Sequence, residues 1–424
     1  MPMPPVEPVE ESVDLLFEGE NVLDVAFITG DEKDFEGAVI TFDEEALLDL
    51  LEGIEGPVTP GTGPILEIPE VGEGGIKVRI PYDGVKAMEA KALTLTINHP
   101  LGSHTLPLEA LSPETTAMRG FTIEKTYLEI IISEPEADTR LRVGNLLEAA
   151  GLEALGDPLD FSAAYSDGEK SYNITGYDRY VERTLIIPED TDPREIATVV
   201  VIGTTGEIRS VPTRIVTTYK NQAAVFKSRS NSVYTLVGHS DGVPGVANHW
   251  SKAAVEDLFS RLVITDRETF DPEAHISRGE FARYITRALG LYGYSTGSGT
   301  LFTDVRTSDP LFEDIQTAVA YGIIQGYPDG TFRPHELISR QEAMVMYARA
   351  MAVVELIPLD NNRIDSYEDR HQVGEWALEG VSEALSVGVF NGTSPTTISP
   401  LLTFRHAEAA TAIRNLLIKS RLIY

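Results

Sequence analysis

The sequence predicts an α+β multidomain protein in which two β-rich, sandwich-like N-terminal domains precede an all-α, pseudo-threefold bundle of three repeats. Short β-branched or alternating segments, bounded by Gly, Pro and Asp, dominate the chain as far as about residue 240. From about residue 242 the pattern becomes helical. Within that helical part a helix-starting motif recurs three times, which is typical of a repeat architecture.

The N-terminal end begins with a leader and a small domain. Residues 1–11 alternate proline and acid, so we expect an extended leader, and they lack the basic and apolar regions of a signal peptide. Residues 12–115 predict an α/β sandwich-like domain. Asp43 is a suitable N-cap for a helix over 44–51, and a second helix is expected over 82–90. Strands are expected over residues 22–28, 38–42, 65–68, 76–80 and 93–97.

Residues 116–240 predict a second, mostly antiparallel β domain. Its strands arrive every 10 to 20 residues with a single helix, over 143–150, among them. Strands are expected over residues 125–132, 159–165, 183–187, 197–202, 211–218 and 233–237.

Three repeats follow, over residues 243–300, 301–363 and 364–424. Each begins with an amphipathic helix and continues through a turn and a proline-containing loop to a second helix. The glutamates near the start of that second helix, Glu280, Glu342 and Glu408, are 62 and 66 residues apart. Because one repeat cannot enclose a core alone, we expect the three to share one.

Composition argues against several kinds of partner and site. The chain has 424 residues, 42% of them apolar, which is enough for several globular domains. Its formal charge of −32 argues against nucleic acid as a partner, since nucleic acid needs a cationic surface. No cysteine is present, so disulfides and cysteine nucleophiles are excluded. No apolar stretch reaches about 18 residues, so no membrane insertion is expected.

A Ser-Arg-x-Glu element opens the second helix of the first two repeats. Residues 277–280 and 339–342 predict capping boxes, in which the serine and the glutamate satisfy free helix amides. Capping does not explain Arg278 and Arg340, because the helix dipole disfavours a cation in the first turn by up to about 1 kcal/mol. An anion bound at the helix start would explain them. The alternative is that each arginine pairs with Asp or Glu of a neighbouring repeat.

The second repeat carries the most specific motif, Gly-Tyr-Pro-Asp-Gly-Thr-Phe-Arg-Pro over 326–334, followed by Ile-Ser-Arg-Gln-Glu over 338–342. With a partial copy on each side, this motif resembles a repeat of the S-layer homology (SLH) domain, and the resemblance covers roughly residues 243–424. In that family the corresponding arginine is understood to bind the pyruvate ketal carboxylate of the secondary cell wall polymer, in grooves between adjacent repeats. The resemblance therefore implies a secreted protein of the cell surface, cell wall or S-layer.

The resemblance also implies a polysaccharide-binding set, carried over position by position. Its members are Trp250 and Arg278 in the first repeat, Gly326, Tyr327, Asp329 and Arg340 in the second, and Trp376, Gly392, Arg405 and His406 in the third.

The three repeats depart from one another. In the third, His406 stands where arginine is expected and Arg405 occupies the cap position, while the second opens with Pro310 in place of tryptophan. We therefore expect one or two competent sites.

No catalytic or cofactor motif is found. The histidines lack paired-ligand spacing, and residues 360–365 lack the central glycine of a calcium loop. The acidic clusters over 31–34 and 134–138 leave structural calcium as an alternative to a solvated surface. We therefore predict no catalytic residue and no cofactor.

These observations predict a non-enzymatic, self-assembling structural protein of the cell surface. The SLH repeats would anchor it non-covalently to pyruvylated cell wall polysaccharide, as a homo-oligomer or lattice. One alternative is an SLH-anchored adhesin or polysaccharide-active enzyme with its function in residues 12–240. Another is that the repeats form a structural bundle and no longer bind a ligand.

Overall fold

The computed structural model describes residues 11–17, 19–22, 24–32, 35–54, 58–59, 61–68, 74–111, 120–203, 205–217, 221–239, 242–291, 302–359 and 363–424. The predicted leader, except its last residue, lies outside these ranges. The chain divides into two compact units. The first consists of residues 1–193, 200–208 and 216–237, and the second of residues 194–199, 209–215 and 238–424.

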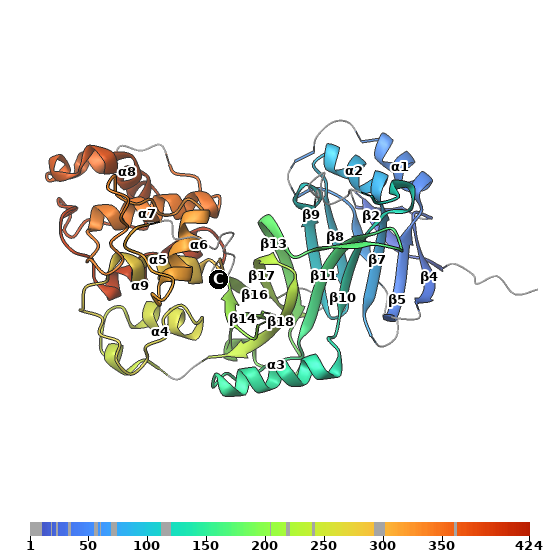
Figure 1. Ribbon diagram of the computed structural model, residues 1–424, viewed down its shortest axis with the longest axis horizontal. Helices are drawn as coiled ribbons and strands as arrows, with labels where there is room; N and C mark the ends of the chain where they lie inside the picture. The colour runs from blue at the N-terminus through green and yellow to red at the C-terminus, as the bar shows by residue number, and fades with distance from the viewer. Residues whose placement is uncertain are drawn as a thin grey trace, which may run out of the picture. The chain divides into compact units, whose positions relative to one another are not determined.

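Two β-sheets form the first unit (Figure 1). Buried and half-buried residues alternate along most of their strands, so each sheet has one face in the core. In the first sheet the strands follow the order β1 (Glu11–Ser12), β4 (Ala26–Glu32), β5 (Phe35–Phe42), β7 (Ile76–Pro81), β10 (Tyr127–Ser133), β11 (Leu159–Ser166) and β18 (Ser232–Gly238), with β12 (Ser171–Ile174) also on β11. In the second the order is β17 (Gln222–Ser230), β13 (Gly176–Ile186), β9 (Gly102–Pro107), β8 (Thr94–His99), β6 (Ile65–Glu67), β2 (Asp14–Phe17) and β3 (Glu20–Val22).

Three further strands, β14 (Ile196–Ile202), β15 (Ile208–Val211) and β16 (Thr213–Thr217), each contain residues of both units.

Helices lie at both ends of the strands of the first unit. Helices α1 (Glu44–Glu52) and α2 (Tyr82–Ala90) lie side by side at one end, and α3 (Ala137–Ala149) lies at the other (Figure 1). As predicted, Asp43 caps α1, because its Oδ1 accepts the Ala46 amide proton at 2.8 Å.

Strands from both predicted N-terminal domains share the same sheets. Strand β7 pairs with β10 over Ile80 and Leu128, and β9 pairs with β13 over His104 and Arg183. The prediction of two separate sandwiches is therefore wrong, although the first 240 or so residues are β-rich. The physical reason is that a strand edge left open in one segment needs a hydrogen-bonding partner, and the other segment supplies it.

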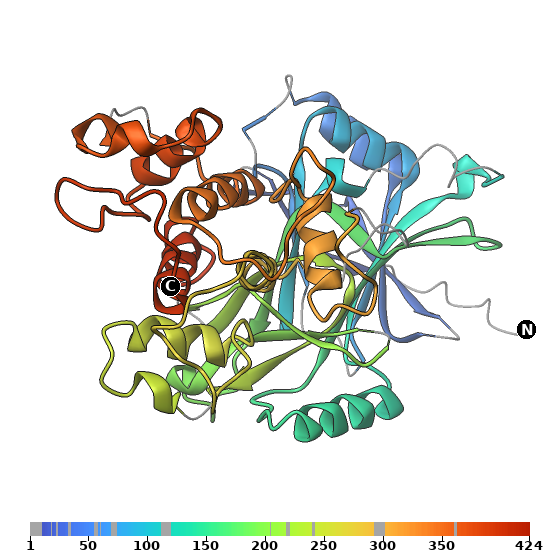
Figure 2. The same cartoon turned by 60° about the vertical axis from the view of Figure 1, so that its left-hand side comes forward.

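The second unit contains six α-helices within its described residues, drawn in Figures 1 and 2. They are α4 (Lys252–Ser260), α5 (Arg278–Ala288), α6 (Phe312–Ala320), α7 (Arg340–Val353), α8 (Leu378–Ser386) and α9 (His406–Lys419). Long connecting segments lie between them. Isolated β-bridges join these segments, for example Ser277 with Leu337 and Ser339 with Thr403.

This unit is therefore only partly helical, and the predicted all-α bundle is wrong. The loop prolines Pro272, Pro334 and Pro400 cannot continue a helix, and the backbone around them instead bonds to a neighbouring repeat.

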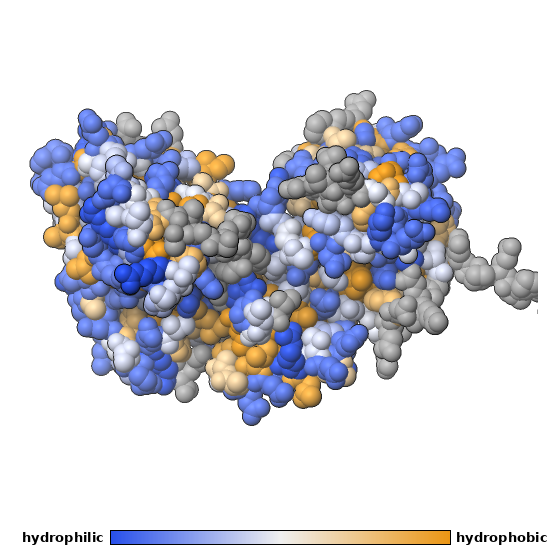
Figure 3. Space-filling model, viewed as in Figure 1, coloured by the Kyte–Doolittle hydropathy of each residue, from blue (hydrophilic) through white to orange (hydrophobic). Residues whose placement is uncertain are grey.

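The surface of both units is largely hydrophilic on the face drawn in Figure 3, as expected for a chain with a formal charge of −32. No helix among the described residues is both long and apolar enough to cross a membrane.

Candidate functional site

Three loops of the second unit bond to one another in a closed ring. The Ile276 amide donates to the Phe404 carbonyl at 2.9 Å, the Phe404 amide to the Ile338 carbonyl at 2.9 Å, and the Ile338 amide to the Ile276 carbonyl at 3.2 Å. Each loop comes from a different repeat and leads into α5, α9 or α7. The starts of these three helices are therefore held together by backbone hydrogen bonds.

One residue of each helix start occupies an equivalent position next to this ring. The amides of Arg278, Arg340 and His406 each donate to a carbonyl of another repeat, at 2.9, 2.9 and 3.0 Å. We call the three places the first, second and third junction. They join the first repeat to the second at Arg278, the second to the third at Arg340, and the third to the first at His406.

At the first junction Arg278 is buried, with 6% of its surface exposed. Its Nη1 donates to Glu342 Oε1 at 2.7 Å, and its Nε donates to the Phe332 carbonyl at 3.0 Å. The Tyr327 hydroxyl donates to the same Glu342 oxygen at 2.7 Å. Burial opposes ionisation of Glu342, but hydrogen bonds from Ser339 and Tyr327 and the charge of Arg278 hold its pKa below the usual value. The first junction is therefore an ion pair between repeats.

The second junction repeats this arrangement. Arg340 is 5% exposed, and its Nη1 donates to Glu408 Oε1 at 2.8 Å. Its Nε donates to the Ile398 carbonyl at 3.0 Å and its Nη2 to the Asn391 carbonyl at 3.1 Å. The capping glutamate of one repeat thus also neutralises the arginine of the repeat before it.

At the third junction an imidazole replaces the guanidinium. His406 Nδ1 lies 3.0 Å from the Tyr284 hydroxyl oxygen. Burial lowers the pKa of His406 below its usual value, although Glu280, Asp271 and Asp266 oppose this effect. The side chain is therefore neutral at pH 7.

Comparison with known proteins finds a family match over the residues of the first two junctions. The family model of the S-layer homology domain matches residues 243–282 and 301–344, which contain Arg278 and Arg340. This chain is a surface protein that contains S-layer homology domains. It is secreted, lies at the cell surface and is associated with the cell wall.

Curated relatives of the SLH protein include enzymes and structural proteins. It is 29% identical over 244 residues to an amylopullulanase of Thermoanaerobacterium thermosulfurigenes, which covers 57% of this chain and 13% of the relative. It is 31% identical to a cellulosome-anchoring protein of Acetivibrio thermocellus over 32% of this chain and 31% of the relative. It is 36% identical to a surface layer protein of Brevibacillus choshinensis over 19% of this chain and 8% of the relative. The chain spans less than a third of the length of each.

The predicted turn of the second SLH repeat meets the arginine of the first. Arg278 Cζ lies 4.7 Å from the centre of the Tyr327 ring, whereas Arg340 contacts the turn of the third repeat, at Asn391 next to Gly392. The prediction grouped Arg340 with Gly326, Tyr327 and Asp329, but the structure groups each arginine with the turn of the following repeat.

The turns themselves are tightly bonded. Asp329 accepts hydrogen bonds from the Thr331 hydroxyl and amide, which together with Arg333 lower the pKa of Asp329 to about 2. A Cβ atom at Gly326 would lie 2.3 Å from the Phe302 ring and 2.8 Å from the Thr331 carbonyl, so only glycine fits there. The Gly392 amide donates to the Tyr367 hydroxyl at 3.1 Å. A Cβ atom at Gly392 would likewise lie too close to neighbouring atoms.

The remaining predicted residues lie farther towards the surface. Trp250 and Trp376 are 63% and 61% exposed. Arg405 forms an ion pair with Glu273, and its amide donates to Glu408 Oε2 at 3.0 Å. Because a guanidinium has only hydrogen-bond donors, the Arg405 side chain cannot accept a bond from a helix amide as serine does. The start of α9 therefore keeps only the part of the capping box in which the glutamate accepts from the N-cap amide.

Sequence reasoning did not identify Glu342 and Glu408 as the partners of the arginines. It left open a pairing with an acidic residue of a neighbouring repeat, and the structure has this pairing. The role of Tyr284 at the third junction was not predicted, because no local pattern links it to His406. Binding of polysaccharide by the predicted set stays a prediction.

Metal binding receives no support within the described ranges, where no three His, Asp or Glu side chains are grouped to hold an ion. The calcium-like segment that begins at residue 360 lies partly outside those ranges.

Proposed function

We propose that this SLH protein is a non-enzymatic structural protein, of the S-layer or associated with it. Its repeats would bind the pyruvylated secondary cell wall polymer without a covalent bond, and copies of the chain would assemble into an oligomer or lattice. Anchoring of a cell-surface protein at the cell wall is supported by the SLH match and by the relatives named as cellulosome-anchoring and surface layer proteins.

One observation carries the choice of an anionic ligand. At the first junction, Arg278 uses Nε and Nη1 for the Phe332 carbonyl and Glu342, while its Nη2 has no hydrogen-bond partner among the described residues. That nitrogen is not among the atoms sealed from solvent. The guanidinium is therefore fixed in direction and keeps free donors, which suits a carboxylate such as a pyruvate ketal.

The second junction has fewer free guanidinium N–H donors for a ligand than the first. Arg340 Nη2 already donates to the Asn391 carbonyl, so all three of its nitrogens are engaged. We therefore place the principal ligand contact at Arg278 and a weaker one at Arg340.

The test is sedimentation of the full chain with cell-wall sacculi that carry the polymer. Arg278→Ala should weaken binding at least tenfold, because a hydrogen bond to a charged group contributes about 1.5–3 kcal/mol. Arg278→Lys should bind with intermediate affinity, since an ammonium keeps the charge but not the planar fork.

A matched control is Arg370→Ala, which removes an exposed arginine that pairs with Asp365. It should bind like the unmodified protein. Thermal unfolding of each variant separates loss of binding from loss of folding. If folded Arg278→Ala sediments as well as the unmodified chain, the ligand contact lies elsewhere.

A further inference from the structure

The third junction lacks the cation that the other two contain. His406 takes the backbone position of Arg278 and Arg340, as its amide hydrogen bond to the Ala274 carbonyl at 3.0 Å shows. Its side chain is shorter, and its Nδ1 faces the Tyr284 hydroxyl at 3.0 Å. No ion pair joins His406 to Glu280 within the part of the chain that the structure describes.

Glu280 is consequently left with one unused oxygen. Its Oε2 accepts from the Ser277 amide at 2.9 Å and from the Ser277 hydroxyl at 2.7 Å, as Oε2 of Glu342 does with Ser339. At Glu342 and Glu408 the other oxygen takes a guanidinium at 2.7 and 2.8 Å. At Glu280 this oxygen has no hydrogen-bond partner among the described residues.

The Glu280 carboxylate is ionised at neutral pH. Burial opposes ionisation, but the hydrogen bonds from Ser277 and, to a smaller degree, the nearby charge of Arg283 hold the pKa of Glu280 below its usual value. No cation is bonded to its second oxygen among the described residues, and a half-buried carboxylate without a directly paired charge is costly, so this position favours a cation.

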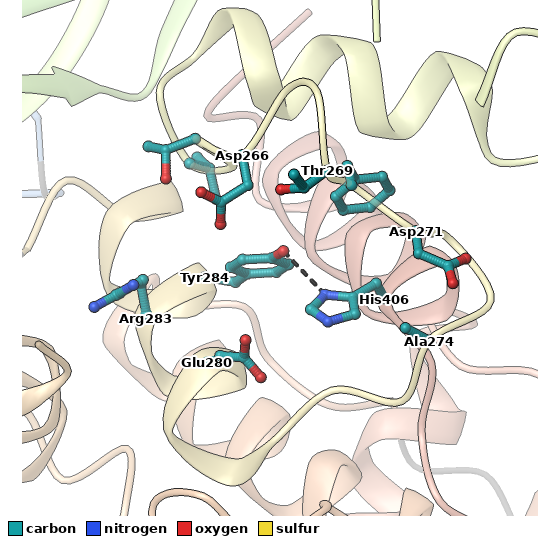
Figure 4. A pocket seen from close by; sticks show the side chains of 11 residues that line it. Asp266, Thr269, Asp271, Ala274, Glu280, Arg283, Tyr284 and His406 are labelled. Atoms are coloured by element: carbon teal, nitrogen blue, oxygen red, sulfur yellow. Dashed lines mark hydrogen bonds between the residues drawn. The ribbon is translucent and has the colours of Figure 1, made fainter. Parts of the chain in front are cut away.

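A pocket of about 180 Å³ lies at this place (Figure 4). Figure 4 shows Glu280 beside the hydrogen-bonded Tyr284 and His406. Phe270 also lines the pocket, with its ring centre 5.7 Å from that of His406. Asp266 and Asp271 add negative charge at the rim. Arg283 also lines the pocket, but its guanidinium is engaged by Asp314 at 2.9 Å and by the Pro310 carbonyl.

We propose that the third junction binds an organic cation, a protonated amine or a guanidinium group, in the place that arginine fills at the other two junctions. Carboxylate and aromatic walls together suit such a group. The natural source that we favour is the free amino group of an amino sugar in the wall polysaccharide. That choice of source rests on the proposed wall anchoring, whereas cation binding itself does not.

The test measures binding of methylguanidinium, glucosamine and N-acetylglucosamine to the full chain at pH 7.5, by calorimetry and by thermal shift. Methylguanidinium reproduces the missing group, glucosamine carries the amine, and N-acetylglucosamine is the uncharged comparison. We expect saturable binding of the first two at millimolar concentration and none of the third.

His406→Arg should abolish this binding, because its own guanidinium would reach Glu280. His371→Arg is the matched control, since it adds the same group at an exposed histidine away from the pocket and should bind as before. Should His406→Arg fail to fold, Glu280→Gln removes the charge and keeps the cap, and it should weaken binding at least tenfold.

Lowering the pH provides an independent readout. The pocket places Glu280, Arg283 and Tyr284 of α5 and the loop residues Asp266 and Asp271 around His406. Protonation of His406 adds a positive charge to this group, so binding of methylguanidinium, whose own charge is constant, should weaken as the pH falls below the usual pKa of histidine. Imidazole NMR signals of His406 should respond to the bound cation, and those of exposed His371 should not.

Each outcome decides one part of the proposal. Absence of saturable binding, or binding that persists in His406→Arg, overturns the cation site. Binding of methylguanidinium without glucosamine overturns the amino-sugar source alone. Sedimentation with sacculi is read in parallel, so failure of wall anchoring and failure of the cation site are distinguishable.

Discussion

At the scale of single residues, an arginine in the first turn of a helix is unfavourable by itself and is explained by its partner. Arg278 and Arg340 are each neutralised by the capping glutamate of the following repeat. One carboxylate thereby satisfies its own helix start and a neighbour's buried cation. Loss of either partner would leave a buried charge unpaired, which costs about 3–5 kcal/mol in other proteins. The Ser-Arg-x-Glu motif therefore has a structural role that does not depend on a ligand.

A second buried group predicts acid sensitivity of the first unit. His104 is fully buried, neither of its ring nitrogens has a hydrogen-bond partner among the described residues, and Arg183 lies opposite on β13. Burial, with a smaller contribution from Arg183, lowers the pKa of His104 well below 6.5. Because the unfolded chain then binds the proton more readily, stability should be full above pH 6.5 and fall as the pH decreases below it.

Urea unfolding of His104→Leu between pH 7.5 and pH 4.5 checks this prediction. The slope of the free energy of unfolding against pH should decrease by up to about 1.4 kcal/mol per pH unit. His99, whose pKa burial lowers to about 4, keeps part of the slope in the variant. His371→Leu, at an exposed histidine, serves as the control. An equally steep slope in His104→Leu would contradict the assignment.

At the scale of elements, helix starts were predictable because their signals are local. Asp43 before α1 and the serines before α5 and α7 form the expected caps. Strands β9 and β17 were not predicted. The sequence of β9, Gly-Ser-His-Thr-Leu-Pro, is poor in β-branched residues, and it forms a strand because β8 and β13 pair with it on both sides.

The cap of α7 gives a prediction at this scale. Ser339→Ala removes the hydroxyl of the capping box and should lower the free energy of unfolding by about 1 kcal/mol. Since the Ser339 amide still donates to Glu342, the ion pair with Arg278 should remain and wall binding should change little. Ser366→Ala, at an exposed serine, serves as control in the same denaturation experiment. Loss of wall binding in folded Ser339→Ala would show that the cap hydroxyl acts on the ligand.

At the scale of the whole molecule, two predictions were wrong for the same reason: the two separate β domains and the all-α bundle. The two predicted β domains share their sheets, and the three predicted helical repeats are joined through non-helical loops. In each case backbone groups find partners far away in the sequence. Local pattern cannot identify such partners, because it records which residues favour a strand or a helix and not which edges remain open.

The proposed wall binding and assembly are tested on the full chain. The protein should sediment with sacculi that carry the pyruvylated polymer and lose most of this binding on sacculi from a strain that cannot attach the ketal. Electron microscopy of the protein on sacculi that carry the pyruvylated polymer, with and without calcium, should show ordered sheets if copies assemble into a lattice. Equal sedimentation with both sacculi would contradict the pyruvate assignment, and protein scattered without order would contradict lattice assembly.

The sequence by itself determined the helix caps before α1, α5 and α7 and the S-layer homology motifs of residues 243–282 and 301–344, because each depends on residues within a few positions of one another. It also indicated that Arg278 and Arg340 need an anionic partner. Only the tertiary structure decided which partner. Glu342 lies 64 residues from Arg278 and Glu408 lies 68 residues from Arg340, and both meet their arginine only because backbone hydrogen bonds close three loops into a ring. The same ring places His406, in the position of an arginine, in one pocket with the capping glutamate Glu280.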